Sequence, residues 1–176
     1  MTEVIPHSRF TDFDINLFKS GKHYRLYEKF GSHPMTLDGV EGTYFAVWAP
    51  SAKAVSVIGD FNYWIEGQHQ LNVRWDQSGI WEGFIPGTGK GTIYKYKIQS
   101  HHNDVKTEKA DPYARRNEHP PKTASIVWDE PYEWQDSKWM AKRKKHNALD
   151  APFSVYEVHL GSWKKQVEEN RFLSYV

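Results

Sequence analysis

The 176-residue sequence contains no cysteine. A disulfide-stabilised scaffold and a thiolate metal site are therefore excluded, and the composition suits a reducing compartment. The sequence also lacks long apolar runs. Met1–Phe10 has no hydrophobic signal-peptide core, and no window is long enough to cross a membrane. We therefore expect a soluble, cytoplasmic protein with no membrane partner.

The sequence also has no marked excess of positive or negative charge. Twenty-three basic and twenty-two acidic residues give a net charge of +1, which argues against a nucleic acid as the main partner. The one strong charge run, Lys142–Lys145, lies in the polar segment 133–151. Charge runs usually form a solvated face, so we interpret this segment as a linker or short exposed helix between two domains.

Aromatic residues, by contrast, are abundant. They make up 15% of the sequence and include eight Trp and ten Tyr. Such side chains bury large apolar areas and can therefore form a sufficient hydrophobic core. The chain length allows one ordinary domain and a further segment. Trp and Tyr also favour surfaces on which flat ligands stack.

The N-terminal part of the sequence indicates two short helices. Residues 11–14 have the form of a capping box, with Thr11 as N-cap and Asp14 three residues later. Gly21 ends the first element, and residues 23–30 indicate a second helix. Both helices are too short to be stable alone, so we expect them to pack on the domain that follows.

From residue 42 onward the hydrophobic period changes to two, which is typical of β-strands. Turn signals rich in Gly, Asp, Asn and Ser separate the alternating segments. Many short strands of this kind predict an all-β, immunoglobulin-like antiparallel β-sandwich. The expected strands are residues 43–48, 54–58, 80–85, 94–98 and 123–128, with a hairpin tip at 102–104.

A glycine-rich segment and nine histidines could each signal a ligand site. The segment Gly87–Gly91 has the spacing of a phosphate loop, but an alternating strand follows it where a phosphate loop needs a helix N-terminus. A hairpin turn is the favoured interpretation. The histidines show no metal-ligand spacing. We therefore expect neither a metal site nor a bound cofactor.

The candidate binding site is the turn Gly59–Trp64, which follows an expected buried strand. An aromatic side chain on a loop that leaves a rigid strand can stay exposed and stack on the apolar face of a sugar ring. Tyr94, Lys95 and Tyr96 could supply a hydrogen-bond donor nearby. Lys95 lies in an alternating strand, in which its neighbours Tyr94 and Tyr96 face the other way. In the competing interpretation Trp64 simply fills the end of the sandwich, and spacing alone favours that interpretation.

Residues 154–163, with the sequence Ser-Val-Tyr-Glu-Val-His-Leu-Gly-Ser-Trp, indicate the start of a second structural unit. They predict one strand, with room after it for part of a helix. A single parallel-type strand can neither pair its backbone nor bury its apolar face. We therefore expect an accessory β-domain followed by the edge of a larger domain, whose other residues lie beyond Val176.

Several motifs resemble enzymes that act on α-glucans. Tyr44–Trp64 looks like the glycogen-binding module of such enzymes and of AMP-activated kinase β-subunits. His23–Pro34 and Lys109–Ala114 closely resemble 1,4-α-glucan (glycogen) branching enzymes. Val155–Trp163 resembles the first strand of their catalytic (β/α)8 barrel, and Phe172–Tyr175 the start of the helix region after it.

The resemblance implies a role in glycogen biosynthesis. Branching enzymes cut an α-1,4 glucan and rejoin the piece through an α-1,6 bond, using two carboxyl groups and a glycosyl-enzyme intermediate. Those groups lie at the ends of later barrel strands. No catalytic residue is therefore assigned here, and this chain alone is expected to be inactive. The implied partners are an α-glucan and the rest of the barrel.

The resemblance also implies the sugar contacts. In the kinase-type modules these involve the Trp that matches Trp64 and the Lys that matches Lys95, which form the candidate substrate-binding pair. A second stacking Trp of those modules has no clear counterpart at His101–Val105. In branching enzymes such a module can brace the barrel and hold distant parts of a long glucan.

Two classes of function are left open. One is the N-terminal part of a branching enzyme. The other is a stand-alone glycogen-binding module with a regulatory or targeting role, which would have no use for the motif at Val155–Trp163. A debranching or trehalose-forming relative is disfavoured by His23–Pro34. The expected domains are an N-terminal helical segment (1–33), the β-sandwich module (34–132), a linker (133–151) and the truncated start of the barrel (152–176).

Overall fold

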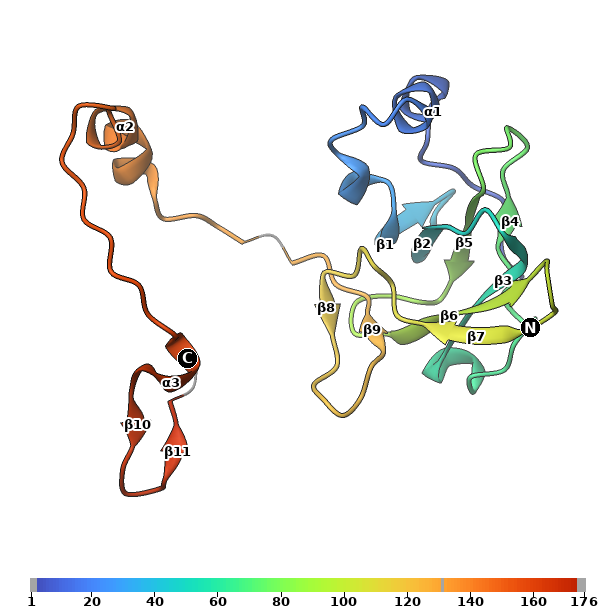
Figure 1. Cartoon of the computed structure of the whole chain (residues 1–176). Coiled ribbons are helices and arrows are strands. Elements are labelled where there is room, and N and C mark those ends of the chain that lie inside the picture. The colour runs from blue at the N-terminus through green and yellow to red at the C-terminus, as the bar shows by residue number, and fades with distance from the viewer. Residues whose placement is uncertain (1–2, 131, 174–176) are drawn as a thin grey trace. The chain divides into compact units, whose positions relative to one another are not determined.

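The structure, a computed structural model, describes residues 3–130 and 132–173. The chain divides into two compact units, Met1–Pro131 (unit 1) and Tyr132–Val176 (unit 2), whose elements are labelled in Figure 1. The described residues of unit 1 form one α-helix, two 3-10 helices and nine strands. These are α1 (Asp12–Lys19), η1 (Leu26–Glu28), β1 (Gly31–Leu37), β2 (Val40–Trp48), β3 (Ala52–Gly59), η2 (Asp60–Asn62), β4 (Asn72–Val73), β5 (Ile80–Pro86), β6 (Ile93–Ser100), β7 (Lys106–Lys109), β8 (Arg116–Asn117) and β9 (Ser125–Ile126).

The strands of unit 1 form two sheets. Sheet A has the order β1-β2-β5-β4, and sheet B has the order β3-β6-β9-β8 with β7 also paired to β6. Every strand pairing among the described residues of unit 1 is antiparallel. This confirms the predicted antiparallel β-fold. β1 lies outside the expected strands and forms a hairpin with β2 through Asp38-Gly39, both at positive φ.

The chain crosses between the sheets where the sequence suggested a local hairpin. β5 belongs to sheet A and β6 to sheet B, so the expected hairpin turn at Gly87–Gly91 is wrong. The segment is a crossing held from both sides. The Gly87 N–H donates to the Glu41 carbonyl at 3.0 Å, and the Gly91 N–H donates to the Val127 carbonyl at 2.9 Å. Hairpins and crossings use the same turn residues, so local sequence does not distinguish them.

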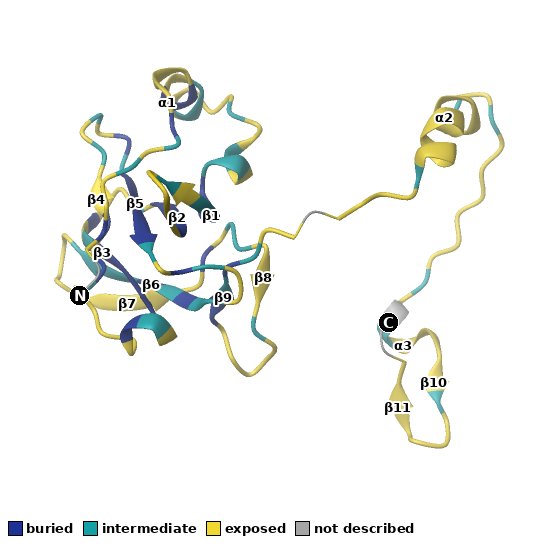
Figure 2. Ribbon diagram, turned by 180° about the vertical axis from the view of Figure 1, so that it is seen from behind, coloured by how far each residue is buried: buried dark blue, intermediate teal, exposed yellow. Residues whose placement is uncertain are grey.

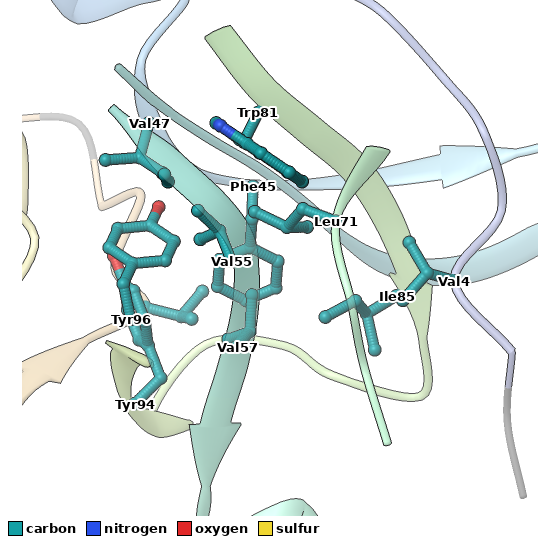
Figure 3. Close-up of a cluster of buried hydrophobic side chains, with 12 residues drawn as sticks. Val4, Phe45, Val47, Val55, Val57, Leu71, Trp81, Ile85, Tyr94 and Tyr96 are labelled. Atoms are coloured by element: carbon teal, nitrogen blue, oxygen red, sulfur yellow. The ribbon is translucent and has the colours of Figure 1, made fainter. Parts of the chain in front are cut away.

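The two sheets share a buried core, shown in Figure 3. Burial of each such side chain contributes about 1.5–3 kcal/mol before conformational entropy is subtracted. The labelled core residues are Phe45, Val47, Trp81 and Ile85 from sheet A, Val55, Val57, Tyr94 and Tyr96 from sheet B, and Val4 and Leu71 from connecting segments.

Sheet A is also covered on its outer face. Tyr44, Ala46 and Ile80 point to that face, where Phe10, Ile15 and Phe30 of the N-terminal segment join them in a second buried cluster. β2 is therefore buried on both sides, as the dark blue strands of Figure 2 show. Two-sided burial explains why residues 44–47 of this strand are continuously apolar in sequence instead of alternating.

Helix α1 begins at its predicted capping box. Thr11 Oγ1 accepts from the Asp14 N–H at 3.2 Å, and Asp14 Oδ2 accepts from the Thr11 N–H at 2.8 Å. Asp14 also pairs with Lys29 at 2.8 Å and with His23 at 3.0 Å. Burial alone would raise the pKa of Asp14, but the hydrogen bonds from Lys29, Thr11 and His23 hold that pKa well below its usual value.

The second helix expected at residues 23–30 is only the 3-10 turn η1. The chain enters β1 at Gly31, which has a positive φ of 95°. The Phe30 ring stacks on Tyr113 at a centroid distance of 5.2 Å. The segment is therefore positioned by tertiary packing rather than by helix propensity.

The Asp111 carboxylate is the buried polar centre of unit 1. Its Oδ2 accepts hydrogen bonds from the hydroxyls of Tyr94, at 2.6 Å, and Tyr96, at 3.1 Å. Its Oδ1 accepts from the Tyr113 N–H at 2.8 Å, and its own N–H donates to Ser125 Oγ at 2.9 Å. Burial raises the pKa of Asp111, and the hydrogen bonds from the two tyrosines and the Tyr113 N–H oppose that rise.

Unit 2 contains little regular structure. It consists of helix α2 (Ser137–His146), the short helix α3 (Leu160–Trp163) and a hairpin of β10 (Lys165–Gln166) and β11 (Arg171–Phe172). α2 has no buried residue and carries the basic run, as expected for a solvated segment. No helix in the described ranges is long and apolar enough to cross a membrane.

The barrel strand expected at Val155–Trp163 is not present in the structure. Residues 152–159 have no regular structure, residues 160–163 are helical, and Phe172 lies in a strand instead of a helix. Residues 174–176, which include the end of that motif, lie outside the described residues. A parallel strand needs neighbours to satisfy its backbone, and Val155 and Tyr156 are accordingly 81% and 77% exposed.

We predict that Asp111→Asn destabilises unit 1 by about 1–3 kcal/mol. An amide offers one oxygen where the carboxylate offers two, so either the tyrosine hydroxyls or the Tyr113 N–H lose their acceptor in a buried site. Urea unfolding at neutral pH measures the change. Asp129→Asn, at an exposed position, serves as the matched control. A change within about 0.5 kcal/mol of the parent for Asp111→Asn would contradict the assigned role.

We also predict that residues 155–159 exchange their amide hydrogens almost freely. Residues 155–159 belong to no helix or strand, whereas Val55–Ile58 are buried residues of β3, which pairs with β6. Hydrogen exchange followed by NMR should find the strand amides slower by about a thousandfold or more, after correction for intrinsic rates. Equal protection of both segments in a monomer would contradict the expected absence of structure at 155–159.

Candidate functional site

The loop that leaves β3 holds its aromatic residues in an unusual backbone conformation. Gly59 ends the strand, η2 follows, and then Tyr63 and Trp64 both adopt left-handed φ angles of 54° and 61°. A residue with a Cβ atom in this region loses roughly 1–2 kcal/mol. Two such aromatic residues in succession persist only where the surrounding contacts impose the conformation, which is a recurrent feature of binding loops.

Asn62 supplies those contacts. Its side chain is buried, and its Oδ1 accepts from the Gly59 N–H at 2.9 Å. Its Nδ2 donates to the Val57 carbonyl at 2.9 Å and lies 2.9 Å from His69 Nδ1. The Trp64 N–H in turn donates to the Gly59 carbonyl at 3.0 Å. The loop is thus closed on itself and fixed to the strand that precedes it.

Gly59 is required by a close approach of two segments. A Cβ atom on Gly59 would lie 2.1 Å from the carbonyl oxygen of Ile93 and 2.9 Å from the Phe61 ring. The Phe61 ring packs on the inter-sheet core and makes an edge contact with His69 at a centroid distance of 5.0 Å. In the Gly-Asp-Phe-Asn pattern, Gly59, Phe61 and Asn62 therefore fix the loop, and Asp60 is the residue that reaches the surface beside Trp64.

Trp64 is held at the surface by this loop. Its side chain is 38% exposed and lies outside both buried clusters, so it does not fill the end of the sandwich. The indole N–H donates to Asp60 Oδ1 at 2.9 Å, which fixes the orientation of the ring. The neighbouring Tyr63 is 85% exposed.

Lys95 comes to the same place from β6, the strand next to β3 in sheet B. It lies opposite Ile58 in the β3–β6 pairing. Its neighbours Tyr94 and Tyr96 point into the core and are fully buried, as the alternation predicted. Both tyrosine hydroxyls bind Asp111. Of Tyr94, Lys95 and Tyr96, it is therefore Lys95 that is available to a ligand.

Trp64 and Lys95 line one surface depression of about 380 Å³. The other lining side chains place two carboxylates and a second ammonium group around the indole. Lys122 and Glu118 form an ion pair at 3.3 Å. Such a surface offers an apolar platform surrounded by hydrogen-bonding groups of both signs. The remaining lining residues are Asp60, Ile93, Glu118, Lys122, Thr123 and Ala124.

Sequence analysis named Trp64 and Lys95 but missed the segment 118–124. That segment reaches the depression because β9 pairs with the start of β6, with Tyr94 opposite Ser125. The Glu118 N–H also donates to the Ala124 carbonyl at 2.9 Å. No periodicity or motif connects 118–124 with Trp64, because the contact depends on strand pairing between distant segments.

Comparison with known families matches residues 29–114 to a family model described as carbohydrate-binding module 48 (isoamylase N-terminal domain). This range contains the loop, Trp64 and Lys95. Segment 118–124 lies just beyond it.

Comparison with characterised sequences finds 1,4-alpha-glucan branching enzymes. That of Thermosynechococcus vestitus is 56% identical over 156 residues, covering 88% of this chain and 20% of the relative. That of Aquifex aeolicus is 51% identical over 169 residues, covering 96% of this chain and 26% of the relative. The chain thus spans only about a fifth to a quarter of the length of these relatives.

Among solved structures, Klebsiella pneumoniae pullulanase complexed with maltotriose is 25% identical, with a TM-score of 0.45. The match covers 57% of this chain and 10% of that chain.

We predict that Asn62→Ala destabilises the protein by about 1–3 kcal/mol, since it leaves the Gly59 N–H and the Val57 carbonyl without their buried partner. Urea unfolding measures the loss. Hydrogen exchange of the Trp64 amide should speed up at the same time, because the loop is no longer closed. Asn103→Ala, in an exposed turn, is the control; an equal effect of the two substitutions would rule out a special role for Asn62.

Proposed function

The chain is homologous to the N-terminal region of 1,4-alpha-glucan branching enzymes and contains a carbohydrate-binding module 48, and we propose that this module binds α-glucan through Trp64 and Lys95. The glucan would be glycogen or a starch-like polymer. In this proposal the indole stacks on the apolar face of a glucosyl ring, and Lys95 donates a hydrogen bond to a ring hydroxyl.

One observation supports this proposal above the others: an exposed indole on a rigid loop lies in the same depression as a lysine from a different strand. A flexible aromatic side chain would lose conformational entropy on binding, whereas this loop is fixed before any ligand arrives. The four charged groups around the indole suit sugar hydroxyls, which both donate and accept hydrogen bonds.

For the whole protein we propose the activity of its relatives, the transfer of an α-1,4-glucan segment to a 6-hydroxyl group to form a branch. The carboxyl groups that this chemistry needs are not assigned to any residue of this chain, so we expect the 176 residues alone to show no branching activity. The contribution proposed for this region is to hold glucan near the catalytic domain or to brace that domain.

The proposed division into domains follows the same relationship. We propose an N-terminal helical segment (1–33), the β-sandwich module (34–132), a linker (133–151) and the start of a catalytic barrel (152–176). In this proposal Phe153, Val155 and Tyr156, which are exposed in unit 2, contact barrel neighbours in the longer protein.

The alternative, a stand-alone regulatory or targeting module, is less well supported. The match to the Aquifex aeolicus branching enzyme covers 96% of the chain and so extends well into unit 2. A module that acts alone would not need the sequence of unit 2 to follow that of an enzyme.

Affinity electrophoresis through a gel that contains glycogen tests the proposed site. The parent should be retarded, and Trp64→Ala should weaken binding by about fivefold, since stacking by one aromatic ring contributes on the order of 1 kcal/mol. Lys95→Ala should weaken it by a smaller factor, because the amine is replaced by water at a partly exposed position.

Two surface substitutions provide matched controls: Trp139→Ala in α2 and Lys22→Ala after α1, both exposed. Neither should change the retardation. Urea unfolding of each variant shows whether a lost interaction reflects a lost fold. A folded parent that migrates as fast in glycogen as in a plain gel would refute the proposed function.

A further inference from the structure

Trp75 is an exposed aromatic residue on a rigid turn of sheet A. It directly follows Arg74 in the turn after β4, and its side chain is 83% exposed. The turn is fixed on both sides: the Arg74 N–H donates to the Ile80 carbonyl at 2.9 Å, and the Ser78 N–H donates to Asp76 Oδ1 at 3.0 Å. The backbone therefore keeps a large apolar side chain in solvent.

The Trp75 indole N–H has no acceptor among the described residues of the chain. Trp48, Trp64 and Trp81 each donate theirs to a protein oxygen at 2.9–3.1 Å. A Trp that neither fills the core nor bonds to its own protein adds exposed apolar surface without stabilising the fold. Its free N–H is available to a ligand oxygen.

Trp75 separates two depressions, and it lines both. One has a volume of about 460 Å³ and is also lined by Asp12, Asn16, Lys19 and Gln77. The other has a volume of about 350 Å³ and is also lined by Ser8, Asn72, Arg74 and Glu82. Both volumes fall in the range of small-molecule sites, and neither depression shares a residue with the one at Trp64.

The polar groups beside Trp75 are held in place before a ligand binds. Arg74 Nε donates to Asp76 Oδ2 at 2.9 Å, and Arg74 Nη1 donates to Glu82 Oε1 at 2.7 Å. Lys19 Nζ donates to the Asp76 carbonyl at 2.5 Å, which joins α1 to the turn. Carboxylates, amides and cations all line the two depressions, so the surface favours a neutral polyhydroxyl ligand over a strongly charged one.

We infer that Trp75 is the stacking platform of a second α-glucan site, formed by α1, the segment 6–8 and the β4–β5 turn. The inference rests on the ligand class proposed above and extends it to a different surface. A glucosyl ring lies against the indole, and hydroxyl groups on either side meet the polar groups of the two depressions. Two sites on one module increase its avidity for a branched polymer without requiring either site to bind tightly.

Indole resonances distinguish this site from that at Trp64. The full 176-residue chain is labelled with ¹⁵N, and the indole N–H signals are assigned with Trp64→Phe and Trp75→Phe. Titration with maltoheptaose should shift the Trp75 signal with a dissociation constant in the millimolar range, as expected for one stacked ring and a few exposed hydrogen bonds. Cellohexaose, a β-linked glucan, is the control for the linkage.

The possible outcomes separate the two proposals. A shift of the Trp64 signal alone overturns the second site and leaves the proposed function standing. A shift of the Trp75 signal alone supports the second site and refutes the first. Absence of both shifts overturns both proposals, and would agree with a Trp75 surface that contacts other parts of a longer protein.

Glycogen affinity gels supply a readout with the polymer. Trp75→Ala should weaken retardation roughly three- to tenfold and add to the effect of Trp64→Ala in the double variant. Because Trp75 is exposed, the Trp75→Ala variant should unfold at the same urea concentration as the parent. A loss of binding then cannot be attributed to unfolding. Retardation equal to that of the parent would overturn the second site.

Discussion

The carboxylate of Asp111 connects most of the distant parts of unit 1. Through the hydroxyls of Tyr94 and Tyr96 it is bound to the central strand of sheet B, and through Tyr113 it reaches the N-terminal segment, since the Tyr113 ring stacks on Phe30. This buried carboxyl group depends on its hydrogen-bond partners, because a buried polar group without partners is destabilising. The two buried tyrosines fix the face of β6, and the opposite face then presents Lys95 to solvent.

The surface aromatic residues of unit 1 depend on this framework. Trp64 and Trp75 both follow strands, and both lie on loops whose backbone groups are hydrogen-bonded within the protein. Each ring is available without any rearrangement of the chain, which is the property that makes weak stacking useful for holding a polymer. This pre-organisation depends on hydrogen bonds of side chains behind the rings: Asn62 fixes the Trp64 loop, and Arg74 fixes the Trp75 turn while also lining the depression beside it.

The two units differ in the kind of contacts that stabilise their secondary structure. In unit 1, strands from distant parts of the sequence complete one another, and sheet A is covered by the N-terminal helix as well as by sheet B. In unit 2 the described residues form only local elements, namely two helices and a short hairpin. The apolar pattern at 153–158 specifies which side chains would be buried in a sheet. It does not supply the neighbouring strands that make burial possible.

Local chemistry determined what the sequence could reveal. Thr11 and Asp14 predicted the helix start. Strand alternation placed Lys95 on the face opposite to Tyr94 and Tyr96, and the motifs of residues 23–64 indicated the family. Strand partners were decided by tertiary structure alone: Gly87–Gly91 became a crossing between sheets, segment 118–124 came to lie beside Trp64, and Trp75 remained exposed between two depressions. These outcomes depend on pairings between residues far apart in the chain, and the energy of such pairings is absent from any short window of sequence.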